Sequence, residues 1–131
     1  MVKTGGGRIV HRGDNRHNPP DEIWKAVGNI DIALLTVDAS QHVMGHVHVD
    51  AIIQRLKPRV VVPHHYYIWD VLPRQSNLQT AEAWVSERDV VERIAGPKKI
   101  YRLGELDKLE GAVHYFGEHV NFDKAAWMDG A

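Results

Sequence analysis

The strongest constraint on this chain is a pair of almost entirely apolar segments, residues 30–37 (IDIALLTV) and 59–63 (RVVVP). Segments that are apolar on both alternating faces are typical of strands buried on both sides of a sheet. The stretch between them places apolar residues at helical spacing, with polar residues opposite: Val49, Ile52, Ile53 and Leu56. A strand, a helix and a strand in this order predict a βαβ unit with parallel strands and a right-handed crossover.

Further helices are expected on either side of this unit. After a short strand over residues 8–12, a helix follows Asn18, which can cap it, and Gly28 ends it. Two prolines and two acidic residues suit the first turn of this helix. A third helix is predicted from about Ser76 to a stop at Gly96. Its apolar face would hold Ala81, Trp84, Val85, Val91 and Ile94.

Two more strands are expected near the end of the chain, and they leave the sheet short of cover. Residues 99–103 and 112–116 are predicted to pair as antiparallel strands across a loop. If the three helices lie on one side of the sheet, its other face is bare. Exposed apolar area of that size marks an interface. We therefore expect a homodimer, or a partner chain that covers the open face.

Composition narrows the class of protein. A length of 131 residues fits a single domain over 1–131, and 16 basic against 17 acidic residues exclude a strongly basic nucleic-acid surface. The absence of cysteine excludes disulfides, a cysteine nucleophile and a thiolate zinc site. Without an apolar leader or a run long enough to span a bilayer, we expect a cytoplasmic protein with no membrane partner. Histidine, the commonest neutral metal ligand, is unusually frequent, at 9 residues.

Polar residues directly follow two of the predicted strands. Asp14 comes after the strand over residues 8–12, and His64 and His65 follow the strand over 59–63. In open α/β sheets, ligands collect outside the carboxyl ends of the strands. Two neutral imidazoles at such a place could bind a metal. Each pattern alone also has an ordinary interpretation, since Gly-Asp is a common turn and paired histidines are often simply packed or exposed.

Taken together, these segments resemble the C-terminal half of a metallo-β-lactamase-fold hydrolase. The resemblance covers residues 5–68 and rests on the order of four segments: GGGRIV, GDN, IDIALL and LKPRVVVPHHY. It implies an α/β fold, half of an αββα sandwich, with a mixed sheet and helices mainly on one face. It also implies that Asp14 bridges two metals and that His65 binds the second. His64 falls on the variable position beside His65 and is a further candidate ligand.

The chain departs from the family in one respect. The family's H-x-H-x-D-H signature lies before the Gly-Asp motif, and the residues before Asp14 hold no such cluster. The string HVHVD at residues 46–50 imitates it, but it lies after Asp14 and Ala51 replaces the last histidine. We interpret this string as chance. The alternative is a local metal site, because His46 and Asp50 share a helical face.

The ligand count leaves two kinds of function open. Asp14 and His65 supply two ligands, too few for a tight site, so zinc or another divalent metal should bind weakly or be absent. The missing ligands would come from another chain or from further histidines of this one: His17, His42, His46 or His48. The first hypothesis is a metal-dependent hydrolase, or a truncated relative of one, whose incomplete site is completed by oligomerisation. The alternative is a non-catalytic binding or interaction module derived from that fold.

Overall fold

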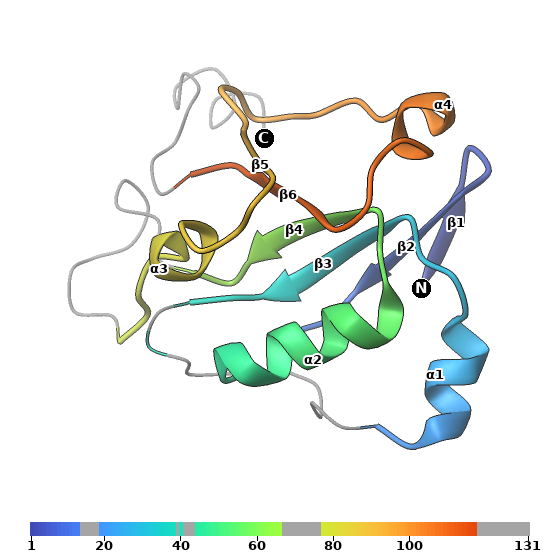
Figure 1. The fold of residues 1–131 in the computed structure, drawn as a ribbon, viewed down its shortest axis with the longest axis horizontal. Coiled ribbons are helices and arrows are strands. Elements are labelled where there is room, and N and C mark those ends of the chain that lie inside the picture. Colours follow the sequence, from blue (N-terminus) through green and yellow to red (C-terminus); the bar gives the residue numbers. More distant parts are fainter. Residues whose placement is uncertain (14–18, 39, 41–43, 67–76, 118–131) are drawn as a thin grey trace, which may run out of the picture.

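A computed structural model describes residues 1–13, 19–38, 40, 44–66 and 77–117 of the chain. Its centre is a six-stranded sheet with the order β1-β2-β3-β4-β6-β5 (Figure 1). The strands are β1 Val2–Thr4, β2 Gly7–His11, β3 Ile32–Thr36, β4 Val60–His64, β5 Val91–Arg93 and β6 Ala112–Tyr115. Only β1 runs antiparallel to its neighbour, so the sheet is mixed, as predicted. All the parallel strands therefore end at one common edge.

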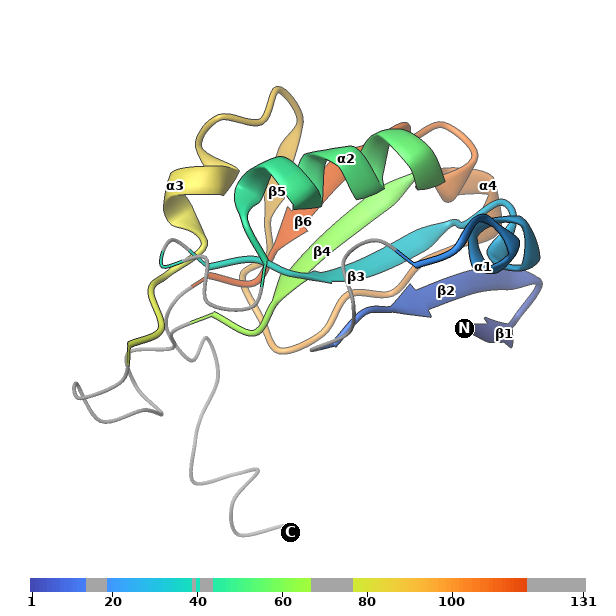
Figure 2. The same ribbon diagram turned by 90° about the horizontal axis from the view of Figure 1, so that it is seen from below.

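The helices lie mainly on one face of this sheet, which confirms the expected fold class. They are α1 Asp21–Val27, α2 His46–Leu56, α3 Glu82–Val85 and α4 Leu103–Leu106. The predicted βαβ unit is present, because β3 and β4 are parallel and α2 connects them (Figure 2). Among the described residues, no helix has the length and apolar character needed to cross a membrane.

The first helix begins later than its sequence signals suggested. Pro20 occupies the N-cap position, and Asp21 and Glu22 form the acidic first turn. Asn18, which we expected to cap the helix, lies outside the described residues. Gly28 adopts a φ of 65° and ends the helix, as predicted. None of the residues of α1 is buried, so this helix is only loosely packed against the sheet.

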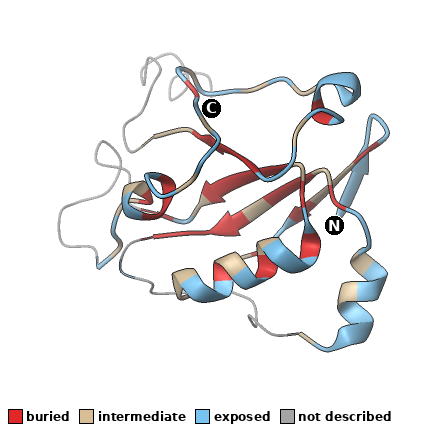
Figure 3. Ribbon diagram, in the orientation of Figure 1, coloured by how far each residue is buried: buried red, intermediate tan, exposed pale blue. Residues whose placement is uncertain are grey.

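The main core lies between the sheet and α2. Ala33, Leu35 and Val61 of the central strands are fully buried against Val49 and Ile52 of the helix (Figure 3). The face of α2 toward the sheet is the one its apolar periodicity predicted. This packing fixes β3 and β4 relative to the start of α2, and so fixes the edge at which the strands end.

The second face of the sheet is covered, contrary to the expectation that it is bare. Ile32, Val60 and Val62 are buried there together with Leu106 of α4. Partly buried residues of the segment after β5, including Tyr101, pack on the same cluster. Figure 2 shows this connection crossing the sheet on the side opposite to α2. An irregular segment therefore packs on apolar residues of the face that we had expected a second chain to cover.

Two predicted elements after residue 77 are wrong. The third helix spans only Glu82–Val85, and Val91 lies in strand β5 because it pairs with Val113. Residues 99–103 form no strand. Strand β6 lies between β4 and β5 and is parallel to both, so both of its edges are already occupied and no antiparallel partner can pair with it.

Candidate functional site

Histidines gather where the parallel strands end. His11 is the last residue of β2, His64 is the last residue of β4, and His65 follows directly. Asp38 comes two residues after β3, and His46 begins α2. The parallel register brings these residues to one edge because successive strands end side by side. This edge is the candidate site.

The best-defined contact of the site joins the ends of β2 and β4. The Nε2 atom of His64 lies 2.7 Å from the carbonyl oxygen of Arg12. A carbonyl can only accept a hydrogen bond, so Nε2 carries the proton and donates it. In the neutral ring this leaves the lone pair on Nδ1. Metal-binding histidines commonly have this arrangement, in which one ring nitrogen is held by a backbone carbonyl and the other is available.

The surroundings of His64 favour its neutral form. Burial lowers the pKa of this imidazole, hydrogen bonds to the backbone of Arg12 and Leu34 oppose the shift, and electrostatic interaction with His11 and His65 lowers the pKa further. The His11 and His64 rings are stacked, with their centroids 4.5 Å apart. A neutral imidazole is the form that binds a metal ion. His64 therefore meets the chemical requirement for a ligand.

His65 stands in an unusual backbone conformation. Its φ is 58°, in the left-handed region that few residues other than glycine adopt. The residue is exposed, whereas the next residue, Tyr66, is buried and packs against Tyr115 with ring centroids 5.4 Å apart. The buried tyrosine anchors the chain immediately after the turn. Backbone conformations of this kind are concentrated at binding and catalytic sites.

Sequence reasoning missed Asp38, which belongs to the same edge. Its side chain is buried and accepts a hydrogen bond from the backbone nitrogen of Ser40 at 2.8 Å. Its carbonyl oxygen accepts a hydrogen bond from Nε2 of His46 at 2.9 Å. The signal that could have revealed it is the same as for Asp14, an acidic residue just after a buried strand. Asp38 shapes the loop between β3 and α2.

The HVHVD string serves the fold. Asp50 accepts hydrogen bonds from Nε1 of Trp84 at 3.0 Å and from Nη1 of Arg88 at 2.9 Å. His46 is bonded to the loop after β3, and His48 is exposed on α2. The carboxylate that a local metal site would need is therefore occupied by other partners, which supports the interpretation of the string as chance.

The structure describes only some of the predicted site residues. His64 and His65 lie at the expected edge, while Asp14, His17 and His42 lie outside the described residues. Strands β2 and β4 flank β3, so the end of β3 lies between the strand that leads to Asp14 and the strand that leads to His65. Within the described part of the chain, no group of three or more potential ligand side chains could hold a metal ion.

Comparisons with known proteins show what this chain is similar to. Residues 1–65 match the profile of the family described as beta-lactamase superfamily domain. A UPF0173 metal-dependent hydrolase of Pyrococcus abyssi is 37% identical over 70 residues, which are 53% of this chain and 31% of that protein.

A solved structure shares the fold. It is a Thermotoga maritima protein assigned as a Zn-dependent hydrolase of the metallo-β-lactamase superfamily, and it matches with a TM-score of 0.69 at 20% identity. The match covers 90% of this chain and 57% of that protein. The chain thus spans about a third of the curated relative and rather more than half of the solved one.

Proposed function

We propose that the chain belongs to the metallo-β-lactamase superfamily, because residues 1–65 match the beta-lactamase superfamily profile and the similar proteins bear the names of metal-dependent hydrolases. Our proposal is that a divalent metal, zinc in the first instance, binds at the edge where β2, β3 and β4 end. In this proposal Asp14 and His65 are ligands, with His64 as a third candidate. The chain acts as part of a hydrolytic centre, and further ligands complete that centre.

The observation that carries the proposal is the hydrogen bond between His64 and the Arg12 carbonyl. It joins the end of β4 to the backbone two residues before Asp14, although the two segments are separated by more than 50 positions in the sequence. The His64 side chain therefore reaches the backbone of the segment that leads to Asp14, although β3 lies between β2 and β4. This supports a shared site for the two residues that the resemblance singled out.

The donor set fits a zinc ion. Neutral imidazole nitrogens and a carboxylate are its usual ligands in proteins without thiolates, and Nε2 of His64 is already held by the Arg12 carbonyl. A metal held there would supply a bound water whose pKa is lowered towards neutrality. The chain's own residues hold the two strand ends together and present the imidazoles at an exposed edge.

We further propose that a second copy of the chain completes the site. Asp14, His65 and His64 provide at most three ligands, and a hydrolytic site needs several fixed ligands together with an open position. Two copies related by a two-fold axis could bring their strand-end edges together. A stable contact of this kind should bury more than about 1,000 Å².

Calorimetric titration of zinc into the purified chain tests the metal site. We expect measurable binding in the wild type and at least a tenfold loss in His65→Ala. The matched control is His48→Ala, which removes an exposed histidine of α2 and should leave the affinity unchanged. Loss of binding in the control but not in His65→Ala would place the metal elsewhere. Wild-type protein that binds no zinc would favour the alternative of a non-catalytic module.

Sedimentation equilibrium with and without zinc tests the second copy. The proposal predicts a dimer whose formation is strengthened by zinc in the wild type and not in His65→Ala. A monomer that binds zinc tightly would show that one chain supplies all the ligands, and would end the proposal of a shared site.

A further inference from the structure

A carboxylate, an imidazole and a phenol lie in a row on the second face of the sheet. His114 of β6 is only 3% exposed, and its Nδ1 lies 2.8 Å from the hydroxyl oxygen of Tyr101. Its Nε2 lies 3.4 Å from a carboxylate oxygen of Glu92, which is on the neighbouring strand β5. The Tyr101 and His114 rings are nearly parallel, with 8° between their planes. The row therefore joins two strands to the segment that covers this face.

The contacts indicate which groups carry the protons at neutral pH. Burial lowers the pKa of His114, the charge of Glu92 opposes the shift and Lys99 reinforces it, so the ring is neutral. A carboxylate can only accept a hydrogen bond, so Nε2, which faces Glu92, keeps the ring proton. Nδ1 is then the acceptor for the Tyr101 hydroxyl. Burial, with a contribution from Glu92, raises the pKa of Tyr101 to about 12, so the phenol stays protonated until a base removes its proton.

Tyr101 also lines a hollow on the same face. The hollow encloses about 440 Å³ between the turn that joins β1 to β2, the starts of β2 and β3, and α4. Ile9, Ile32 and Leu106 form apolar parts of its walls, and all three belong to the cluster on which Tyr101 packs. A volume of this size lies within the range typical of small-molecule sites. A small apolar group held there would lie beside Tyr101.

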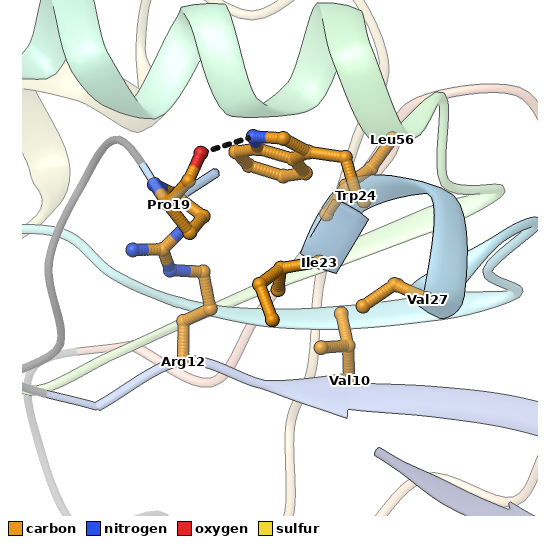
Figure 4. A pocket seen from close by; sticks show the side chains of 7 residues that line it. All are labelled: Val10, Arg12, Pro19, Ile23, Trp24, Val27 and Leu56. Carbon is orange, nitrogen blue, oxygen red and sulfur yellow. Dashed lines mark hydrogen bonds between the residues drawn. The ribbon is translucent and has the colours of Figure 1, made fainter. Parts of the chain in front are cut away.

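The hollow between α1, β2 and α2 provides a comparison (Figure 4). It encloses about 320 Å³, and Ile23, Trp24 and Val27 of α1 are among its apolar walls. None of the described residues that line it carries a hydroxyl or an imidazole. An apolar ester held there would meet no hydroxyl that could accept its acyl group. Apolar space alone therefore does not distinguish the two hollows, whereas the hydroxyl linked to a base does.

We propose that Tyr101, His114 and Glu92 form an acyl-transfer site that works without a metal and takes small apolar acyl groups from activated esters. Tyr101 is the nucleophile, His114 is the general base, and Glu92 orients the imidazole and stabilises its charged form. A hydroxyl, an imidazole and a carboxylate joined in this way activate hydroxyl nucleophiles on unrelated folds. The site shares no residue with the proposed zinc site.

The reaction balances within these groups. The Tyr101 oxygen attacks the carbonyl carbon of the ester, and its proton passes to Nδ1 of His114. The bond from the carbonyl carbon to the leaving oxygen then breaks, and the leaving group takes the proton from Nδ1. Water attacks the resulting ester of Tyr101 and gives a proton to Nδ1, the carboxylic acid leaves, and the Tyr101 oxygen recovers that proton. In both stages the charged imidazole lies beside Glu92.

The test uses p-nitrophenyl butyrate and the full chain, with a chelator present to remove metal. We expect release of nitrophenol, and a butyryl group on Tyr101 in peptide mass spectra after an acid quench. Tyr101→Phe keeps the ring and removes only the hydroxyl, and it should lower the rate at least about tenfold, whereas His114→Gln should lower it about a hundredfold. The matched control is His48→Ala, which removes an exposed histidine of α2 and should leave the rate unchanged.

Three outcomes would overturn the proposal. The first is a butyryl group found only at other residues, which the wild type alone can show even if a variant does not fold. The second is an unchanged rate in Tyr101→Phe. The third is a wild-type rate that the chelator abolishes, because the activity would then belong to the metal site.

The pH profile tests the roles of His114 and Glu92. In the wild type the rate should fall as the pH drops below about 6.5, because a protonated imidazole cannot take the phenol proton. Glu92 raises the pKa of His114, so Glu92→Gln should move this fall to lower pH and reduce the maximal rate. Lys99→Met removes a charge that lowers the same pKa and should move the fall to higher pH. Identical profiles in the three proteins would contradict the assigned roles.

Discussion

The two ends of the parallel strands are held together by different chemistry. At the end where the strands begin, Asp31 accepts a hydrogen bond from the backbone nitrogen of Arg8 at 2.8 Å and another from Arg59 at 3.3 Å. Arg59 also donates to the carbonyl oxygen of Asp107 after α4, at 3.0 Å. At the end where the strands finish, imidazole side chains form hydrogen bonds to backbone carbonyls. His64 bonds to the carbonyl of Arg12, and His46 bonds to the carbonyl of Asp38.

The difference separates a structural end from a functional one. An aspartate that accepts hydrogen bonds from a backbone nitrogen and from an arginine has little capacity left for a ligand. An imidazole that donates one N–H to a carbonyl keeps a lone pair on its other nitrogen. The first arrangement ties three strands and α4 together, and the second places imidazoles at an edge that is already fixed.

The largest effect is expected at the structural end. Asp31→Ala removes the acceptor of two hydrogen bonds, one of them from a charged group, and should lower the free energy of unfolding by about 2 kcal/mol. Urea denaturation followed by circular dichroism measures this loss. Zinc affinity of the folded variant should be unchanged. A stability loss below a few tenths of a kcal/mol would show that the two ends do not differ in this way.

A smaller loss is expected from Asp50, the acid of the HVHVD string. Asp50→Ala deprives Trp84 and Arg88 of their shared acceptor and should cost about 1 kcal/mol, since the carboxylate is partly exposed. The same urea experiment applies. Zinc binding should not change, and a loss of zinc binding with intact stability would revive the local metal site that we rejected.

The smallest effect concerns pH. His114 is buried on the second face, with its Nδ1 2.8 Å from the hydroxyl of Tyr101 and its Nε2 3.4 Å from Glu92, which also binds Lys99. Burial lowers the pKa of His114, opposed by Glu92 and reinforced by Lys99. The unfolded chain therefore binds protons more readily than the folded one, and stability should fall as pH drops below about 6.5.

A variant isolates this contribution. His114→Gln keeps a polar side chain but cannot be protonated, so its unfolding free energy should depend less on pH between 5 and 7 in urea titrations. Part of the dependence should remain, because the pKa of His64 is lowered as well. A pH dependence in the variant as steep as in the wild type would show that His114 does not contribute.

The sequence alone predicted the helices and strands correctly where the local pattern of apolar residues determines the structure. The unit from β3 to β4 was predicted because its core residues, such as Val61 and Ile52, follow the period of their own elements. Val91 was misplaced because its β-branched side chain fits a helical face equally well, and only pairing with Val113 assigns it to a strand. Pairing partners more than 20 positions apart leave no periodic signal.

The candidate site was predictable only in part, for the same reason. His64 and His65 were predicted as candidates because the sequence shows that they directly follow a predicted buried strand. The bond between His64 and Arg12, the burial of Asp38 and the cover that Tyr101 gives to the second face all depend on contacts between distant segments. Such contacts follow from the packed sheet and not from any single stretch of the chain.

The central claim is that the metal-binding capacity of this chain lies in the imidazoles at the strand-end edge. Long-range nitrogen–proton spectra of the histidine rings during a zinc titration test it residue by residue. The account predicts that His64 carries its proton on Nε2 before zinc is added, and that the His64 and His65 signals then move while those of His114 stay fixed. Movement of His46 and His48 with a stationary His65 would contradict it.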